Sequence, residues 1–232
     1  MYRERPARVP GGVLWTSVAA EDGDVLIVPD GCMDLMWCDG SLQIAGPDSV
    51  PYPARIQAGA ELAGLRFAPG TASAVLGIPA HELLGQRMPL DDLWSVAEAR
   101  RAAERVADAP DHGAALETLA VELVGRAEPP DPLIGALVAQ ASAGRPVADM
   151  AERAGLSERQ LLRRCLPAFG YGPKTLARIL RAQRALALAR SARRPGFADV
   201  AAAAGYADQA HLSREIRVLT GRPLSAAVET EP

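Results

Sequence analysis

Cysteine is scarce in this sequence, and its count is odd. The 232 residues include three cysteines, Cys32, Cys38 and Cys165, and three scattered histidines. An odd, low number argues against a disulfide framework and fits a reducing compartment. Five residues separate Cys32 from Cys38. This spacing is wider than the about two to four residues that usually separate zinc ligands. We therefore expect ordinary buried thiols, no metal site and no cofactor.

Long apolar runs, targeting signals and catalytic motifs are missing as well. No run approaches the ~18 residues that a membrane-spanning helix needs, and the mean hydropathy is +0.02. No apolar segment of signal-peptide length follows the charged N-terminus. A phosphate-binding glycine loop, a GxSxG elbow and an HExxH motif are all absent. These absences predict a soluble, cytoplasmic protein that binds no membrane and is not an enzyme.

Lysine is nearly absent, because only Lys174 among the 25 basic residues is a lysine. Arginine forms bidentate bonds to phosphate and guanine that lysine cannot imitate, although a GC-rich genome produces the same bias. The basic residues are also unevenly placed. Residues 1–132 have 10 basic and 20 acidic side chains, a net charge of −10, whereas residues 133–224 have 15 and 6, a net charge of +9.

The formal net charge of −3 therefore combines two modules of opposite charge. Such asymmetry between the halves of a chain is typical of proteins that bind nucleic acid. Three prolines in Arg126–Pro132 mark a short, stiff linker between these modules. We therefore divide the chain into an N-terminal domain (residues 1–126), a linker (127–132) and a C-terminal domain (133–232).

The N-terminal domain changes character after about residue 67. Before that point, short apolar runs predict strands over residues 12–18, 24–29, 33–38, 41–46 and 61–67, with hairpin turns at Asp22–Asp24 and Cys38–Ser41. Alanine- and leucine-rich stretches then predict helices over residues 71–77, 79–85, 95–109 and 111–126. The predicted fold class is α+β: a small β-rich, barrel- or cupin-like unit with trailing helices, followed by an all-α domain.

The C-terminal domain contains an internal repeat. Val147–Pro173 resembles Phe197–Pro223 at an offset of 50, which becomes 51 after the turn. Each copy predicts a short helix, a turn at Gly155 or Gly205, and a second helix. A solvated charged face on an ordinary helical hairpin is one interpretation. Two copies of the same unit in a module of net charge +9 favour a double helix-turn-helix that binds DNA.

The second helix of each copy has an apolar side and a polar side. Ser157 is a good N-cap for the first of them. Leu161 and Cys165 are expected to face the core, as are Leu212 and Ile216 in the second copy. The polar sides carry arginine, glutamine and serine, which can bond base edges in the major groove.

A single long helix is predicted between the two copies, over Pro173–Ala192, with Pro173 at its first position. Twenty helical residues span about 30 Å, which is close to the ~34 Å of one turn of B-DNA. A rigid helix of this length can place two reading helices in successive major grooves. Lys174, Arg178 and Arg181 on this helix are candidates for phosphate contacts.

Together, these features resemble the DNA-binding domain of AraC-type transcriptional regulators. The resemblance covers about Leu133 to Ala227, and its specific part is GYADQAHLSREIRVLTGRP in the second copy. Three positions depart from the family pattern: Pro223 comes one residue early, Cys165 replaces a usual phenylalanine, and Leu162 replaces a polar residue. The stretches VPDGCMDLMW, AGPDS and GLRFAPG are similar to a compact β-rich domain found in some actinobacterial members.

This resemblance implies a bacterial transcription factor whose two recognition helices enter adjacent major grooves. Carried over by position, the base-reading residues are Arg159, Gln160, Arg163, Gln209, His211 and Arg214. The phosphate contacts are Ser157, Lys174, Arg178, Arg181 and Arg217. The expected partner is double-stranded promoter or operator DNA, with a small-molecule effector and RNA polymerase as further candidates. The protein is expected to be a monomer or a homodimer.

An effector site is best sought around VPDGCMDLMWC, where the candidate ligand residues are Asp30, Asp34 and Trp37, together with Arg66. In a strand, Asp34 faces away from Trp37. Arg66 on a later strand can pair with an aspartate, structurally or as an anchor for an anion. PDG is more often a simple turn with a capping aspartate, so an N-terminal domain that only contacts a partner protein is the other interpretation.

The alternative function is a DNA-repair or other enzyme fused to such a DNA-binding domain. Repair chemistry of this kind needs four metal-ligating cysteines and a separate nucleophilic cysteine, whereas this chain has three in all. Cys165 is moreover expected on the buried side of a reading helix.

Overall fold

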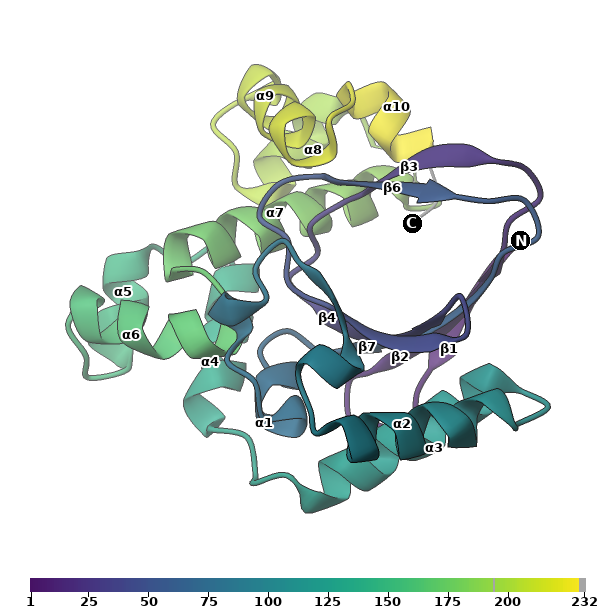
Figure 1. Ribbon diagram of the computed structural model, residues 1–232. Coiled ribbons are helices and arrows are strands. Elements are labelled where there is room, and N and C mark those ends of the chain that lie inside the picture. The colour runs from purple at the N-terminus through teal and green to yellow at the C-terminus, as the bar shows by residue number, and fades with distance from the viewer. Residues whose placement is uncertain (194, 230–232) are drawn as a thin grey trace.

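Two β-sheets face each other across the N-terminal half of the molecule (Figure 1). The computed structural model describes residues 1–193 and 195–229, so Arg194 and the predicted end of the C-terminal domain, 230–232, lie outside the described residues. One sheet is antiparallel with the order β1-β2-β7-β4-β5-β8, and the other pairs β3 with β6. The strands are β1 (Tyr2–Pro6), β2 (Val13–Val18), β3 (Gly23–Ile27), β4 (Met33–Cys38), β5 (Ser41–Ala45), β6 (Tyr52–Ile56), β7 (Glu61–Phe67) and β8 (Arg87–Pro89).

The strands expected from apolar runs are all present as β2, β3, β4, β5 and β7. The three others, β1, β6 and β8, each contain a proline and occupy a sheet edge, where a missing N–H is tolerated. The hairpin at Cys38–Ser41 is confirmed, since β4 pairs with β5. The hairpin predicted at Asp22–Asp24 is wrong, because β2 and β3 belong to different sheets and Asp22 instead accepts a hydrogen bond from the Ala58 N–H at 2.7 Å.

Helices cover one face of the six-stranded sheet (Figure 1). They are α1 (Ala72–Leu76), α2 (Val96–Ala107) and α3 (His112–Arg126), with the short 3-10 helices η1 (Ala80–Glu82) and η2 (Leu90–Asp92) between α1 and α2. The residues 79–85 that predicted a helix thus form only one 3-10 turn. In register, Leu14, Leu65 and Leu35 stand side by side on neighbouring strands and are 6%, 0% and 0% exposed. Burying each such side chain stabilises the fold by about 2 kcal/mol.

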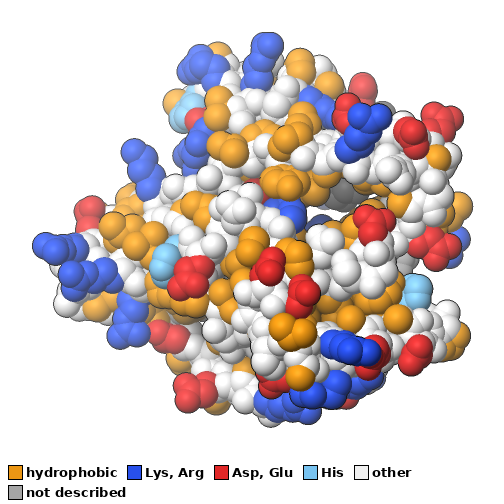
Figure 2. Space-filling model, viewed as in Figure 1, with side chains coloured by type: hydrophobic (Ala, Val, Ile, Leu, Met, Phe, Trp, Pro, Cys, Tyr) orange, Lys and Arg blue, Asp and Glu red, His pale blue; other side chains and the backbone are white. Residues whose placement is uncertain are grey.

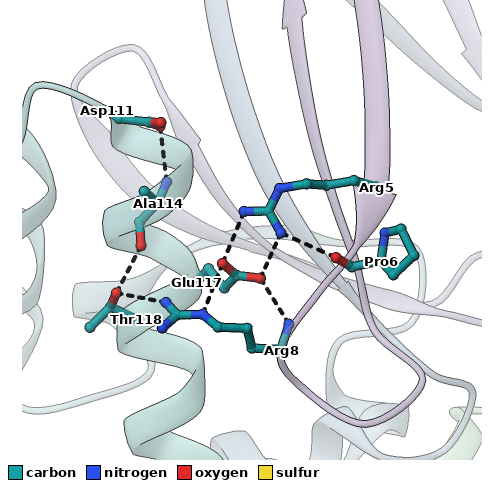
Figure 3. Close-up of polar contacts among 7 residues, drawn as sticks. All are labelled: Arg5, Pro6, Arg8, Asp111, Ala114, Glu117 and Thr118. Carbon is teal, nitrogen blue, oxygen red and sulfur yellow. Dashed lines mark hydrogen bonds and ion pairs between the residues drawn. The ribbon is translucent and has the colours of Figure 1, made fainter.

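An ion-pair cluster joins the first strand to α3 (Figure 3). Glu117 of α3 is buried, and its carboxylate accepts two hydrogen bonds from the Arg5 guanidinium of β1, at 3.0 and 2.9 Å. It also accepts from the Arg8 backbone N–H at 2.8 Å. Hydrogen bonds from Arg5 are the largest cause that lowers the pKa of Glu117, to about 2. This cluster holds an edge strand that has little apolar sequence of its own.

The C-terminal half is entirely helical among the described residues 132–193 and 195–229. It contains α4 (Pro132–Ser142), α5 (Val147–Arg153), α6 (Glu158–Phe169), α7 (Pro173–Arg190), α8 (Phe197–Ala204), α9 (Gln209–Thr220) and α10 (Leu224–Glu229). The repeat is confirmed as two helical pairs, α5–α6 and α8–α9, whose turn glycines Gly155 and Gly205 have φ angles of 63° and 78°. These positive angles suit glycine because it has no side chain.

The connecting helix α7 is continuous, as predicted, and Pro173 is at its start. Its 18 residues span about 27 Å. The residues expected to face the core do so, since Leu161, Cys165, Leu212 and Ile216 are all 0% exposed. Cys165 fills the place of the larger residue usual there, next to the buried Phe169.

Two hydrophobic cores correspond to the two halves of the chain. One includes residues from Val9 to Ala120, and the other includes residues from Ile134 to Ala227. The halves touch where α6 packs against α1 and η1. In addition, the Gln183 side-chain amide of α7 donates to the Pro29 carbonyl oxygen at 2.6 Å. No helix within the described part of the chain is long and apolar enough to cross a membrane.

Candidate DNA interface and effector site

Helix α6, the second helix of the first helical pair, presents its predicted base-reading side chains to solvent. Arg159, Gln160 and Arg163 are all exposed. Ser157 is the N-cap and accepts from the Gln160 N–H, while the Gln160 side-chain oxygen accepts from the Ser157 N–H at 2.9 Å. This capping box engages the oxygen of Gln160 and leaves its amide nitrogen free for a base. Arg159 and Arg163 therefore have more freedom to reach DNA than Gln160 has.

Helix α9, the second helix of the other pair, has a similar arrangement of capping and exposed residues. Gln209 and Arg214 are exposed, and Asp208 caps the helix by accepting from the His211 N–H at 2.6 Å. The His211 ring makes an edge-on contact with the buried ring of Tyr206, with 5.2 Å between the centroids. His211 is consequently half-buried and more constrained than its two neighbours on the polar side.

The cations of α7 lie in a groove between the two helical pairs. Lys174 is exposed, whereas Arg178 and Arg181 are half-buried. The groove has a volume of about 610 Å³ and is lined by these three side chains and by Arg145, His211 and Glu215. Arg217, the remaining predicted phosphate contact on α9, is exposed. Figure 2 shows Lys and Arg side chains along the edge formed by α9, the start of α7 and α6.

A second polar cluster lies on the open face of the six-stranded sheet, toward the β3–β6 pair. Figure 2 shows the surface hollowed there. Arg66 Nε of β7 lies 3.2 Å from Asp30 Oδ2 and 3.5 Å from Asp34 Oδ1. The predicted pairing of Arg66 with an aspartate is confirmed, and both aspartates take part. The Trp15 indole N–H donates to Asp34 Oδ2 at 3.2 Å.

Some atoms of this cluster lack a full set of partners. Asp34 Oδ1 and Arg66 Nε are buried without a hydrogen bond, in spite of their ion pairs, and so is the Tyr171 hydroxyl that follows α6. Burial, as the largest cause, raises the pKa of Asp34 to about 6, against the opposing effect of Arg66. Burial also raises the pKa of the Cys32 thiol beside it. Buried polar atoms without partners are uncommon and are typical of strained or ligand-binding places.

Trp37 is not part of this cluster. It lies on the opposite face of β4, 5% exposed, with its ring 5.4 Å from that of His112 in α3. Successive side chains of a strand point to opposite faces, so Asp34 and Trp37 cannot share a site on one face. The structure brings Asp30, Asp34 and Arg66 together and leaves Trp37 in the core.

Several residues of these sites were not found from the sequence. Trp15 is contributed by a strand far from Asp34 in the chain. Arg87 pairs with the buried Asp48 at 2.7 Å, and its guanidinium stacks over Tyr52 at 3.9 Å. No local pattern marks these residues, because each contact joins separate strands or loops.

The thiols only partly follow the expectation. Cys165 is buried, but Cys32, just before β4, and Cys38, at the end of that strand, are partly exposed. Within residues 1–193 and 195–229, no group of three or more His, Cys, Asp or Glu side chains is placed to hold a metal ion.

Two helix-turn-helix units on one long helix, next to a β-rich domain, define a DNA-binding regulator as the class of this protein. Residues 150–229 match a family described as a helix-turn-helix domain, of the AraC type. Residues 13–89 match a family described as a domain of unknown function, DUF6597. The helical part of the chain is therefore a helix-turn-helix domain of the kind found in AraC-type transcriptional regulators. No curated protein matches the sequence significantly.

Solved structures of ToxT from Vibrio cholerae share the fold. An apo variant is 10% identical, with a TM-score of 0.53 over 97% of this chain and 98% of that chain. Another ToxT structure is 9% identical, with a TM-score of 0.52 over 98% and 97%. A third, bound to (E)-4-(8-methylnaphthalen-1-yl)but-3-enoic acid, is 8% identical, with a TM-score of 0.52 over 98% of both chains. The whole architecture, with the β-rich domain in front of the helical domain, is thus one that these proteins have in common.

Proposed function

We propose that this regulator reads two adjacent major grooves with α6 and α9, under the control of a ligand or partner of its N-terminal domain. The supporting observation is that two helical pairs with exposed polar sides are joined by the continuous helix α7. In this proposal Arg159, Gln160 and Arg163 read one half-site, and Gln209, His211 and Arg214 read the other. Ser157, Lys174, Arg178, Arg181 and Arg217 contact phosphates and add affinity without sequence choice.

The test is a gel-shift titration of promoter fragments, starting with the region beside the protein's own gene, at two salt concentrations. We expect binding that weakens steeply with salt, because each neutralised phosphate releases counterions. A matched control is Arg101→Ala, which removes an exposed arginine of α2 and should leave binding unchanged. Weak, salt-independent affinity for every fragment contradicts the proposal.

Control by a small molecule is the finer part of the proposal, and the hollow at Arg66 is its site. Arg66 is paired with Asp30 and Asp34, yet its Nε and the Asp34 Oδ1 make no hydrogen bond. One ToxT structure contains an unsaturated fatty acid and another an aryl butenoic acid. We therefore propose an organic acid as the effector class, with its carboxylate on Arg66.

A thermal-shift screen of organic acids, including fatty acids, tests this site. A ligand at a free concentration of about a hundred times its Kd stabilises the folded state by about 2.7 kcal/mol. This stabilisation raises the Tm by a readily measured amount. Arg66→Gln should abolish the rise, whereas Arg55→Gln, on an exposed position of β6, should not. An absence of any shift across a broad panel favours an N-terminal domain that only contacts a partner protein.

The domain limits and the setting of the protein follow the same proposal. We assign residues 1–126 to the regulatory domain, 127–132 to the linker and 133–232 to the DNA-binding domain. A promoter target places the protein in the cytoplasm, where RNA polymerase is a further candidate partner.

A further inference from the structure

Glu215 is the one carboxylate that lines the groove between the helical pairs, among the residues that the structure describes. The groove is otherwise lined by the cations Arg145, Lys174, Arg178 and Arg181 and by His211. Lys174, Arg178 and Arg181 are spaced by four and three residues, so they share one face of α7. A surface made to contact phosphates thus contains a charge of the opposite sign to its cations.

Glu215 is held against α7. It belongs to α9, one turn after His211, and its side chain is 21% exposed. The Arg178 Nε–H donates to Glu215 Oε2 at 2.7 Å. The Arg181 guanidinium is 4.0 Å from the same oxygen and lies over the Tyr206 ring at 4.4 Å.

Arg178 and Arg181 therefore differ in how closely their guanidinium groups pair with Glu215. Arg178 has a direct carboxylate partner. The Nε of Arg181, by contrast, is buried without a hydrogen-bond partner. The Arg181 Nη2 group, 4.0 Å from Glu215, makes no hydrogen bond to it. A phosphate oxygen that enters the groove can pair with this group, but to reach Arg178 it has to share or displace the carboxylate.

From this geometry we infer that Glu215 limits the affinity of the protein for DNA and thereby suppresses binding to random sequence. A carboxylate beside the phosphate path repels every duplex equally, whatever its sequence. A specific site offsets this penalty through base contacts of α6 and α9, whereas a random site has only the phosphate contacts. The difference between the two binding free energies is unchanged, but at a given protein concentration the weaker, random sites lose their occupancy first. The inference rests on the proposed DNA-reading function and assigns a role to a residue outside the predicted contacts.

The test uses the full-length protein and a labelled 30-bp random-sequence duplex, with fluorescence anisotropy over a series of salt concentrations. Glu215→Gln should bind about 3- to 10-fold more tightly near 0.1 M salt, because one fixed negative charge leaves the groove. The slope of log K against log salt should steepen by about one, since Arg178 becomes free to release a counterion from the duplex. A purely structural role predicts a loss of affinity and not a gain.

Two matched variants separate this effect from a change of total charge. Glu128→Gln removes the same charge at an exposed linker position and should leave the affinity within about twofold of the unmodified protein, given screening over the distance. Glu215→Asp keeps the negative charge in the groove and should likewise stay close to the unmodified protein. Equal gains for Glu215→Gln and Glu128→Gln would overturn the inference.

A double-mutant cycle with Arg178→Gln identifies the partner. In the Arg178→Gln background, the gain from Glu215→Gln should shrink, because the residue that it liberates is gone. Duplexes selected from a random pool by the unmodified protein supply the specific sequence. On these, Glu215→Gln should gain about as much as on random DNA, because the repulsion that it removes is the same for every sequence.

Failure of the inference differs from failure of the proposed function. If the unmodified protein binds random duplex in a salt-dependent way but Glu215→Gln binds no more tightly at an unchanged Tm, the role of Glu215 is refuted and DNA reading stands. If the unmodified protein shows no salt-dependent binding at all, both fall together. If the Tm of Glu215→Gln drops, the affinities are compared at a temperature at which both proteins are fully folded, and the absence of a gain there likewise refutes the role of Glu215.

Discussion

The two helix-turn-helix units have similar structures but make different contacts with the N-terminal domain. Both have a second helix capped at its N-terminus and held by residues of 0% exposure, Leu161 in one and Leu212 in the other. The first unit packs against the N-terminal domain through contacts of α6 with α1 and η1. In addition, the Ser73 hydroxyl donates to the Ala168 carbonyl oxygen. The second unit approaches that domain near Leu26 of β3, close to Gly221.

This difference shows that the N-terminal domain contacts two similar units unequally. It packs directly against α6. It also contacts α7, whose Gln183 donates to the Pro29 carbonyl oxygen beside the Asp30–Arg66 pair. The helix that joins the two units is therefore bonded to a segment that borders this pair.

The largest difference between the two units is expected when the equivalent glycines that end α6 and α9 are substituted. Gly170 and Gly221 have φ angles of +82° and +70°, so alanine costs about 1–2 kcal/mol at either. An added Cβ at Gly170 also lies 2.7 Å from Pro47 Cγ and 3.1 Å from the Ala80 carbonyl oxygen. Overpacking of this kind adds about 1–3 kcal/mol.

We therefore expect Gly170→Ala to destabilise the protein by about 3 kcal/mol in urea unfolding, and Gly221→Ala by clearly less. At Gly221 the added Cβ meets only the Leu26 side chain, at 3.1 Å, which is able to move. Equal losses for the two variants would show that the first unit is not seated more firmly than the second.

Loosening the N-terminal domain should affect the first unit more than the second. Glu117→Gln removes the charge-assisted bonds to Arg5 and Arg8, at a cost of about 2 kcal/mol. Hydrogen exchange should then speed up in α6 more than in α9. The exposed pair of Arg100 and Glu104 gives the control, since Glu104→Gln should leave the stability almost unchanged.

The loss caused by Glu117→Gln should depend on pH in a defined direction. The pKa of Glu117 is lowered from 4.5 to about 2 in the folded state, so its stabilising effect is present above pH 4.5 and lost as the pH falls toward 2. The unfolding free energies of the two proteins should thus converge in acid. A difference that stays constant from pH 7 to pH 2.5 contradicts the ion pair.

The equivalent arginines of the two reading helices test whether the units contribute equally to recognition. Arg214→Ala should lose about 1–3 kcal/mol of specific binding if it makes a bidentate base contact, and Arg163→Ala should lose a similar amount. Anisotropy with selected and random duplexes measures both. An equal loss on the two kinds of DNA would reassign either residue to a phosphate contact.

The smallest effect is expected where α7 meets the N-terminal domain. Gln183→Ala removes one hydrogen bond, to the Pro29 carbonyl oxygen, and should cost about 1 kcal/mol of stability. Its DNA affinity should stay close to that of the unmodified protein. The change in DNA affinity that an effector causes should be smaller in this variant, because α7 has lost its hydrogen bond to the segment next to Asp30. A full response in this variant excludes the contact as a route of coupling.

Much of the C-terminal domain was predictable because its signals are local. Caps at Ser157 and Asp208, turn glycines and apolar positions three or four apart determine where each helix lies and which side it buries. The polar faces of the reading helices follow from the same periodicity. In the N-terminal domain the apolar strands were predictable, but β1, β6 and β8 were not, since edge strands are stabilised by pairing partners and not by their own composition.

The sequence by itself determined the repeat, the opposite charges of the two modules and the faces of α6 and α9, since each depends on neighbouring residues or simple counting. Only the tertiary structure decided that Asp22–Asp24 leads between sheets, that Trp37 is in the core, and that Glu215 pairs with Arg178. It also decided which unit rests on the β-rich domain. These outcomes depend on contacts between distant segments, whose geometry is set when the sheets and helices pack together.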